Sequence, residues 1–143
     1  MKALFLDIDG VLCTHQDNSF LDEEENFNEG CCKNLKSIID NTGCKIVLIS
    51  SWRLYASYRS LLLKLLKPYG ITKLDFLGVT KSLISRAEEI SEFLNAHKDI
   101  EKFVILDDEK IISKLIPSDK IINTQKNSGI TKEITKQCIE LLT

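Results

Sequence analysis

The chain has 143 residues, of which 43% are hydrophobic and 28% are charged, and this size and composition predict one domain over residues 1–143. The formal net charge of −2 gives no general attraction to nucleic acid or to an anionic membrane. No signal peptide is visible and no apolar run approaches the roughly 18 residues of a membrane span. The five cysteines follow no metal-binding spacing, which favours reduced thiols and a cytoplasmic location.

Alternating apolar segments predict an α/β protein. In chain order, we expect a strand at 2–6, a helix at 29–41, a strand at 45–49, a helix at 52–66, a strand at 74–77, a helix at 85–98, a strand at 102–106, a short helix at 111–115, a strand at 120–123 and a helix at 130–141. Three of these strands are continuously apolar, as strands buried on both faces of a parallel sheet are. The sequence therefore predicts a three-layer, Rossmann-like fold with helices on both faces of the sheet.

Polar side chains follow the three continuously apolar strands, at the point where each strand ends. Asp7 and Asp9 follow the first strand. Ser50 follows the second, and the pair Asp107 and Asp108 follows the third. Because the carboxyl ends of parallel strands meet at one edge of the sheet, we expect these groups to converge. Four carboxylates in one place would repel unless a cation lay among them, and oxygen ligands of this kind suit Mg²⁺.

These residue types are suited to phosphoryl transfer. Asp7 ends a buried strand and is the candidate nucleophile, whereas Asp9 can protonate the leaving oxygen and later activate water. Gly10 permits the turn that brings Asp9 over the site. Ser50 and nearby backbone N–H groups can hold phosphoryl oxygens. Arg86, in the first turn of its helix, can bind the phosphate anion.

The same motifs resemble those of the haloacid dehalogenase-like (HAD) phosphatases, in the same order and spacing over about residues 2–108. The run Asp-x-Asp-Gly-Val-Leu from Asp7 looks like motif I, and the strand ending at Ser50 is similar to motif II. Arg86 stands for the motif III cation, with Lys81 as the rival, and Leu-Asp-Asp at 106–108 resembles motif IV. The resemblance implies a sheet in the strand order 5-4-1-2-3.

The resemblance also implies the ligands of the metal ion. Mg²⁺ would be bound by Asp7, by the backbone carbonyl of Asp9 and by a motif IV carboxylate, with Asp108 preferred to Asp107. Two departures from the family pattern leave alternatives open. Motif III is a lysine in most of the family, so Lys81 takes the role if Arg86 does not.

Motif II is a doubled serine here, so Ser51 could replace Ser50 as the phosphate ligand. The string that continues through Trp52 and Arg53, together with the Asp-Asp pair, looks like a small subgroup of HAD domains, some of them found in nucleic-acid repair proteins. Gly10, Trp52 and Arg53 are further candidates for substrate contact. The alternatives are a packing role for Trp52 and a surface salt bridge for Arg53.

The gaps between the motifs leave no room for the cap domain that relatives acting on small metabolites often carry. We therefore expect an open site and a large phosphorylated substrate, either a nucleic-acid end or a phosphoprotein, unless a partner subunit, for example a second copy of the chain, supplies a lid. The acidic segment 22–25 and His15 are predicted to be ordinary loop positions near the entrance.

Two other classes of function compete with a phosphatase. A response-regulator receiver domain uses similar groups, but its acidic pair follows the first strand and its phosphorylated aspartate follows a middle strand, which is the reverse of the order here. A catalytically weak binding or scaffold module could retain the HAD fold. All the expected carboxylates are present, which favours the enzyme.

Overall fold

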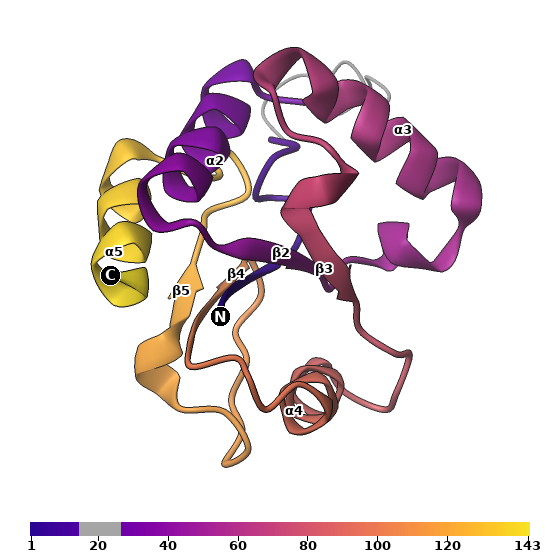
Figure 1. Cartoon of the computed structure of the whole chain (residues 1–143), viewed down its shortest axis with the longest axis vertical. Coiled ribbons are helices and arrows are strands. Elements are labelled where there is room, and N and C mark those ends of the chain that lie inside the picture. The colour runs from indigo at the N-terminus through magenta and orange to yellow at the C-terminus, as the bar shows by residue number, and fades with distance from the viewer. Residues whose placement is uncertain (15–26) are drawn as a thin grey trace.

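In the computed structural model, which describes residues 1–14 and 27–143, five parallel strands form the central sheet (Figure 1). The strands are β1 (Lys2–Leu6), β2 (Lys45–Leu48), β3 (Phe76–Val79), β4 (Lys102–Asp107) and β5 (Ile121–Asn123). Their spatial order is β3-β2-β1-β4-β5, which confirms the predicted 5-4-1-2-3 order. The acidic segment 22–25 and His15 lie outside the described residues.

Strand β1 occupies the centre of the sheet, between β2 and β4. Leu4 is in register with Ile46 of β2 and with Val104 of β4. Successive residues of a strand point to opposite faces. Leu4 therefore packs in the core on one face of the sheet, and Phe5 packs in the core on the other. Because both faces are covered, the apolar run predicted for this strand contains no alternating polar positions.

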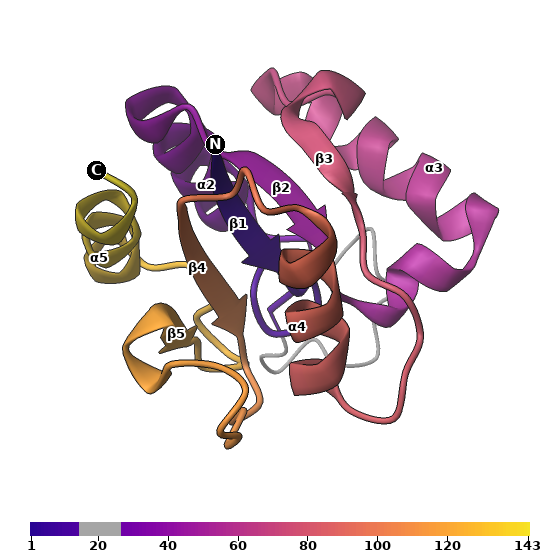
Figure 2. The same cartoon turned by 60° about the horizontal axis from the view of Figure 1, so that its bottom comes forward.

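Helices cover the sheet unequally, as Figures 1 and 2 show. Helices α2 (Glu29–Thr42), α3 (Ala56–Leu66) and α5 (Lys132–Leu142) lie on one face, and α4 (Arg86–Ala96) lies on the other. Short 3₁₀ turns complete the chain: η1 (Ser51–Leu54), η2 (Lys67–Tyr69), η3 (Lys73–Asp75) and η4 (Ser118–Lys120). Among the described residues, no helix is long and apolar enough to cross a membrane.

Two predicted helices differ in the structure. The helix expected at 111–115 is absent, and this segment runs over the surface with Ile112 and Leu115 exposed. The Ser113 hydroxyl accepts the N–H of Leu115 at 3.1 Å, a local bond that competes with helix formation. The helix expected at 52–66 is interrupted because Tyr55 is extended, with φ −124° and ψ 132°. The segment therefore forms η1 and then α3.

The loop after β1 is fastened by residues from the C-terminal third of the chain. The Thr124 hydroxyl donates to the carbonyl of Gly10 at 2.7 Å, and the N–H of Ile130 donates to the carbonyl of Val11 at 3.1 Å. Gly129 adopts φ +60°, and a Cβ there would lie 2.3 Å from the Val11 oxygen. Glycine is therefore required where the two segments cross.

The segments between the motifs contribute to the same layers. Between β2 and α4 the chain forms α3, β3 and the turns η1, η2 and η3, so no domain is inserted there. Of the residues between β1 and β2, those from 27 to 44 contribute helix α2.

Candidate active site

Three carboxylates converge at the carboxyl ends of β1 and β4. Asp7 directly follows β1 and donates its backbone N–H to the carbonyl of Leu106 at 3.0 Å, which aligns the two strand ends. Asp107 is the last residue of β4, and Asp108 follows it. One carboxylate oxygen from each of these aspartates lies within 4.8 Å of the others. Asp7 is 7% exposed and Asp107 is 1% exposed, so most of this negative charge is held away from water.

The electrostatics of the cluster suit a divalent cation. Burial, together with the neighbouring Asp107 carboxylate, raises the pKa of Asp7 to about 8. Burial likewise raises the pKa of Asp107 above its ordinary value. Nearby carboxylates removed from water are difficult to ionise together, and a cation reverses that penalty. Carboxylate oxygens are ligands that Mg²⁺ prefers, so Asp7, Asp107 and Asp108 are side chains that could hold it.

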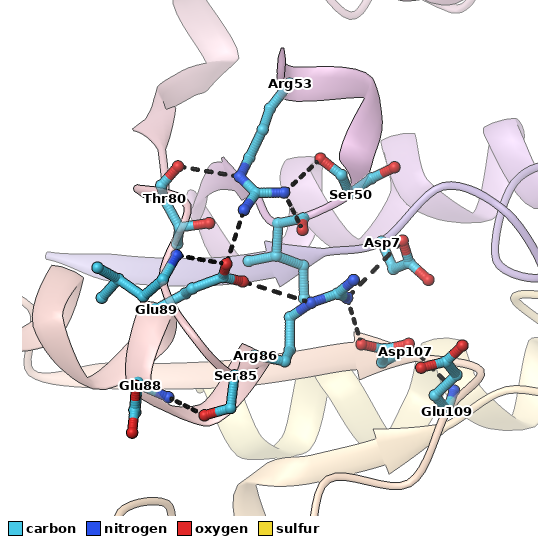
Figure 3. A network of polar contacts seen from close by, with 12 residues as sticks. Asp7, Ser50, Arg53, Thr80, Ser85, Arg86, Glu88, Glu89, Asp107 and Glu109 are labelled. Atoms are coloured by element: carbon cyan, nitrogen blue, oxygen red, sulfur yellow. Dashed lines mark hydrogen bonds and ion pairs between the residues drawn. The ribbon is translucent and has the colours of Figure 1, made fainter.

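Arg86 brings a positive charge to these carboxylates. It is the first residue of α4, and its Nη1 lies 2.6 Å from Asp107 Oδ2 and 3.9 Å from Asp7 Oδ1 (Figure 3). Lys81 lies elsewhere. Its Nζ pairs with Glu92 Oε1 at 3.3 Å, and its side chain is 73% exposed. Of the two predicted phosphate-binding cations, the structure brings Arg86 to the aspartates and leaves Lys81 on the surface of the domain.

The two serines occupy different environments. Ser50 is 1% exposed, and its hydroxyl oxygen accepts the N–H of Trp52 at 3.2 Å, which caps η1. Ser51 lines a cavity of about 220 Å³. The other described residues that line it are Asp7, Asp9, Arg86, Asp108, Glu109 and Lys126. The cavity therefore contains the predicted nucleophile, the predicted acid and one serine of the doubled pair.

Gly10 contributes close packing beside this cavity. Its φ is +79°, and a Cβ at this position would lie 2.5 Å from Asp108 Oδ2. A side chain would displace the carboxylate, so the glycine allows the loop of motif I to approach motif IV. The residue predicted as a weak substrate contact thus has a clear structural reason to be glycine.

Arg53 is an internal residue. It forms a salt bridge, as one of the two alternatives predicted, but this salt bridge is buried and not at the surface. Its side chain is 5% exposed, and it forms an ion pair with the similarly buried Glu89. Each of its five N–H groups has a protein acceptor: Thr80 O and Ile49 O, both at 2.9 Å, Ser50 O at 2.9 Å, Lys81 O at 3.4 Å and Glu89 Oε2 at 3.0 Å. The guanidinium therefore joins the segment after β2 to the segment after β3. These hydrogen bonds occupy the N–H donors with which Arg53 could otherwise bind a phosphate.

Glu89 connects this buried arginine to the cavity (Figure 3). Its Oε2 accepts from Arg53 and from the N–H of Leu83 at 3.0 Å, and its Oε1 lies 3.8 Å from Nε of Arg86. Arg86 is held in turn against Asp107. A continuous polar chain thus runs from Arg53 through Glu89 and Arg86 to the aspartates. Glu89 was not predicted from the sequence, although its position one helical turn after Arg86 is a detectable signal.

Lys126 and Glu109 also line the cavity and were not predicted. Lys126 lies in the turn closed by the bridge between Gln125 and Gly129, directly after β5. Glu109 follows the Asp-Asp pair. Extending the rule of strand ends to the short strand β5 would have identified the lysine.

Trp52 packs in the core, as one of the two interpretations predicted. It is 4% exposed, and its ring centroid lies 5.9 Å from that of Phe27 and 5.2 Å from that of Tyr58. Trp52 also forms part of the wall of a second hollow beside the cavity. The other described residues lining this hollow are Asp9, Ser51, Tyr55 and Tyr58.

Comparison with known protein families finds a match over most of the chain. The model of the family described as "HAD domain in Swiss Army Knife RNA repair proteins" matches residues 3–134. The match includes the residues of the cavity from Asp7 to Lys126. No curated protein and no solved structure matches the chain.

Proposed function

The chain belongs to the family of HAD domains in Swiss Army Knife RNA repair proteins, and we therefore propose that it is a Mg²⁺-dependent phosphomonoester hydrolase. The observation that carries the proposal is the convergence of three aspartates with Arg86 at the carboxyl ends of two central strands. The matching family supports a phosphatase-like activity of HAD type. The spacing of the carboxylates supports the metal ion.

In the proposed reaction, Asp7 attacks the phosphorus of the substrate and forms an aspartyl-phosphate while the bond to the leaving oxygen breaks. Asp9 donates a proton to that oxygen. Asp9 then takes a proton from water, which attacks the phosphorus, releases phosphate and restores the Asp7 carboxylate. Mg²⁺ bound by Asp7, Asp108 and the backbone carbonyl of Asp9 would supply positive charge that offsets the carboxylates and the phosphoryl oxygens.

The remaining cavity residues are assigned to binding of the phosphoryl group. Arg86 is the proposed cation, because it lies at the aspartates whereas Lys81 pairs with Glu92. Ser51 is the proposed hydroxyl ligand, because it lines the cavity while the Ser50 oxygen caps η1. Lys126 adds a second positive charge at the cavity wall.

The proposed substrate is the phosphorylated end of a nucleic acid. The family description refers to RNA repair proteins, and the described segments between the motifs form no cap over the cavity. An uncapped site can accept the end of a polymer that a closed site would exclude. Lys126 and Arg86 place two cations among the carboxylates of this cavity, where they can contact the terminal phosphate of a nucleic acid.

The test is release of inorganic phosphate from short RNA oligonucleotides that carry a 3′- or a 5′-phosphate, with Mg²⁺ present. We expect hydrolysis of one of these ends, loss of activity in Asp7→Asn and loss of activity with a chelator. Activity that survives Asp7→Asn would overturn the assignment of the nucleophile. Binding of phosphorylated RNA without any turnover, by a protein that also binds Mg²⁺, would favour the scaffold module instead.

A further inference from the structure

The second hollow, which we call the aromatic hollow, is formed by Trp52, Tyr55 and Tyr58 together with Asp9 and Ser51. Its volume is about 220 Å³. Trp52 is buried in its wall, whereas Tyr55 is 61% exposed and Tyr58 is 37% exposed. Tyr55 and Tyr58 therefore present aromatic surface to solvent at the mouth of the hollow.

The aromatic hollow is continuous with the phosphate cavity through two shared residues. Asp9 and Ser51 line both spaces. In the proposed reaction Asp9 protonates the oxygen that leaves, so the part of the substrate attached to that oxygen lies near Asp9. The aromatic hollow adjoins this position, because Asp9 also lines it. It is therefore placed to receive the leaving group rather than the phosphoryl group.

The tyrosines are presented in a fixed arrangement. Tyr58 is anchored by its ring contact with Trp52, at a centroid distance of 5.2 Å and an interplanar angle of 63°. Tyr55 and Tyr58 are 6.1 Å apart and inclined at 56°, so the two rings do not stack face to face. The exposed ring of Tyr55 can therefore meet a flat ligand. Tyr55 also immediately precedes α3, and its carbonyl accepts the N–H of Arg59 at 3.1 Å, which fixes its backbone.

We propose that the aromatic hollow is a nucleobase subsite, in which the base of the terminal nucleotide stacks on Tyr55, with Tyr58 beside it, while its phosphate lies against Asp7. The proposal rests on the proposed function and specifies its leaving group. Bases stack readily on exposed aromatic side chains, with little dependence on the identity of the base. A sugar lies between the phosphate and the base of a nucleotide, which matches two adjoining spaces with Asp9 between them.

The first test compares a nucleoside monophosphate with the corresponding ribose phosphate, which differs only by lacking the base. The quantity measured is the ratio of the two kcat/KM values. Tyr55→Ala is expected to reduce this ratio about tenfold, because stacking on one aromatic ring contributes a factor of that order. Tyr55→Phe retains the ring and is the matched control, so it should keep the ratio. An unchanged ratio in Tyr55→Ala would contradict the proposal.

The second test measures binding without catalysis. Trp52 is the only tryptophan of the chain and lies in the wall of the hollow, so its fluorescence reports on occupancy. In Asp7→Asn, adenosine monophosphate should change the fluorescence, and ribose phosphate should change it much less. Tyr55→Ala in the same background should weaken the response to the nucleotide.

The two tests separate failure of the subsite from failure of the proposed function. A nucleotide-dependent fluorescence change that requires Tyr55, with no hydrolysis, would support the nucleobase subsite and contradict the proposed phosphatase activity. Hydrolysis without any preference for the base, and without a fluorescence change, would do the reverse. A phosphotyrosine peptide that surpasses the nucleotide in both tests would overturn the nucleobase assignment in favour of a protein substrate.

Discussion

The carboxylate of Asp7 is buried beside a second carboxylate, and this arrangement has an energetic cost that the proposed metal ion should relieve. The pKa of Asp7 is raised from 3.8 to about 8. A raised pKa means that the folded state favours the protonated form. The corresponding stabilisation is complete below about pH 4 and is lost as the pH rises through 8.

We therefore expect Asp7→Asn to raise the free energy of unfolding of the metal-free protein at pH 8 by about 1–3 kcal/mol. The difference between the variant and the native chain should shrink toward pH 4. Mg²⁺ should stabilise the native chain at pH 8 more than the variant. Denaturant titrations at both pH values, with and without Mg²⁺, provide the measurement. Equal stabilisation of both proteins by Mg²⁺ would show that Asp7 is not a ligand.

A comparison of Gly10 with Gly43 separates the cost of a positive φ for a non-glycine residue from the cost of a steric clash with the added Cβ. Both have positive φ, at +79° and +72°, but a Cβ on Gly10 would meet Asp108 at 2.5 Å, whereas a Cβ on Gly43 would meet nothing within 4 Å. Gly43→Ala should cost about 1–2 kcal/mol of stability through its backbone alone and leave phosphatase activity unchanged. Gly10→Ala should cost at least as much and also abolish Mg²⁺-dependent activity, because Asp108 must move. Retained activity in Gly10→Ala would show that Asp108 is dispensable.

At the scale of the elements, the first turn of α4 positions the cation of the site. Ser85 caps this helix by accepting the N–H of Glu88, while Arg86 and Glu89 extend toward the aspartates and Arg53 (Figure 3). The orientation of Arg86 thus depends on Glu89, whose side chain does not line the cavity.

Glu89→Gln should weaken phosphate binding, because it removes the negative charge that holds both arginines. We expect the inhibition constant of inorganic phosphate to rise, together with a loss of stability of about 1–3 kcal/mol from the uncompensated charge of Arg53. Glu88→Gln is the matched control, since Glu88 is its exposed neighbour. An unchanged inhibition constant in Glu89→Gln, with the stability reduced, would assign Glu89 to folding alone.

The elements that could be predicted from the sequence are those with strong local patterns. The bounds of β1 were predicted because the residues from Ala3 to Leu6 form a continuous apolar run, and all four are buried in the structure. Helix α2 was predicted from its apolar periodicity and its stop at Gly43. The helix expected at 111–115 was wrong, because only Ile111 packs against the core and Ile112 and Leu115 are exposed. A local sequence pattern does not show whether an apolar residue of such a segment will be buried or exposed.

The candidate site likewise contains some residues that the sequence predicted and others that it did not. Asp7, Asp107 and Asp108 converge as expected, because parallel strands must end at one edge. The sequence favoured Arg86 over Lys81 but could not exclude Lys81. Arg86 begins α4 and Lys81 precedes it, and the sequence does not show which of the two side chains points toward the aspartates. Lys126 was missed because it enters from a turn far along the chain.

At the scale of the whole molecule, the five cysteines are free and buried. Burial raises the pKa of Cys32 and of Cys138 to about 12. Their thiolates are therefore scarce at pH 8, and reagents that attack thiolates should react slowly.

We expect the native chain to resist a thiol reagent at pH 8 and to expose five reactive thiols in denaturant. The rate of labelling at low denaturant should follow the rate of unfolding. Rapid modification of one thiol in the native state would show that the domain opens locally at that cysteine. The control is the surface substitution Tyr55→Ala, which should leave the rate of labelling unchanged.

The contact between Thr124 and Gly10 has a consequence for biosynthesis. The two residues are separated by 114 positions, yet Thr124 holds the loop that carries Asp9. β4, which bears Asp107, likewise pairs with β1 across about a hundred positions of sequence. A ribosome therefore has to release the chain at least as far as Thr124 before Asp7 and its partners can meet. We expect the proposed activity of the emerging chain to be absent until that point of synthesis.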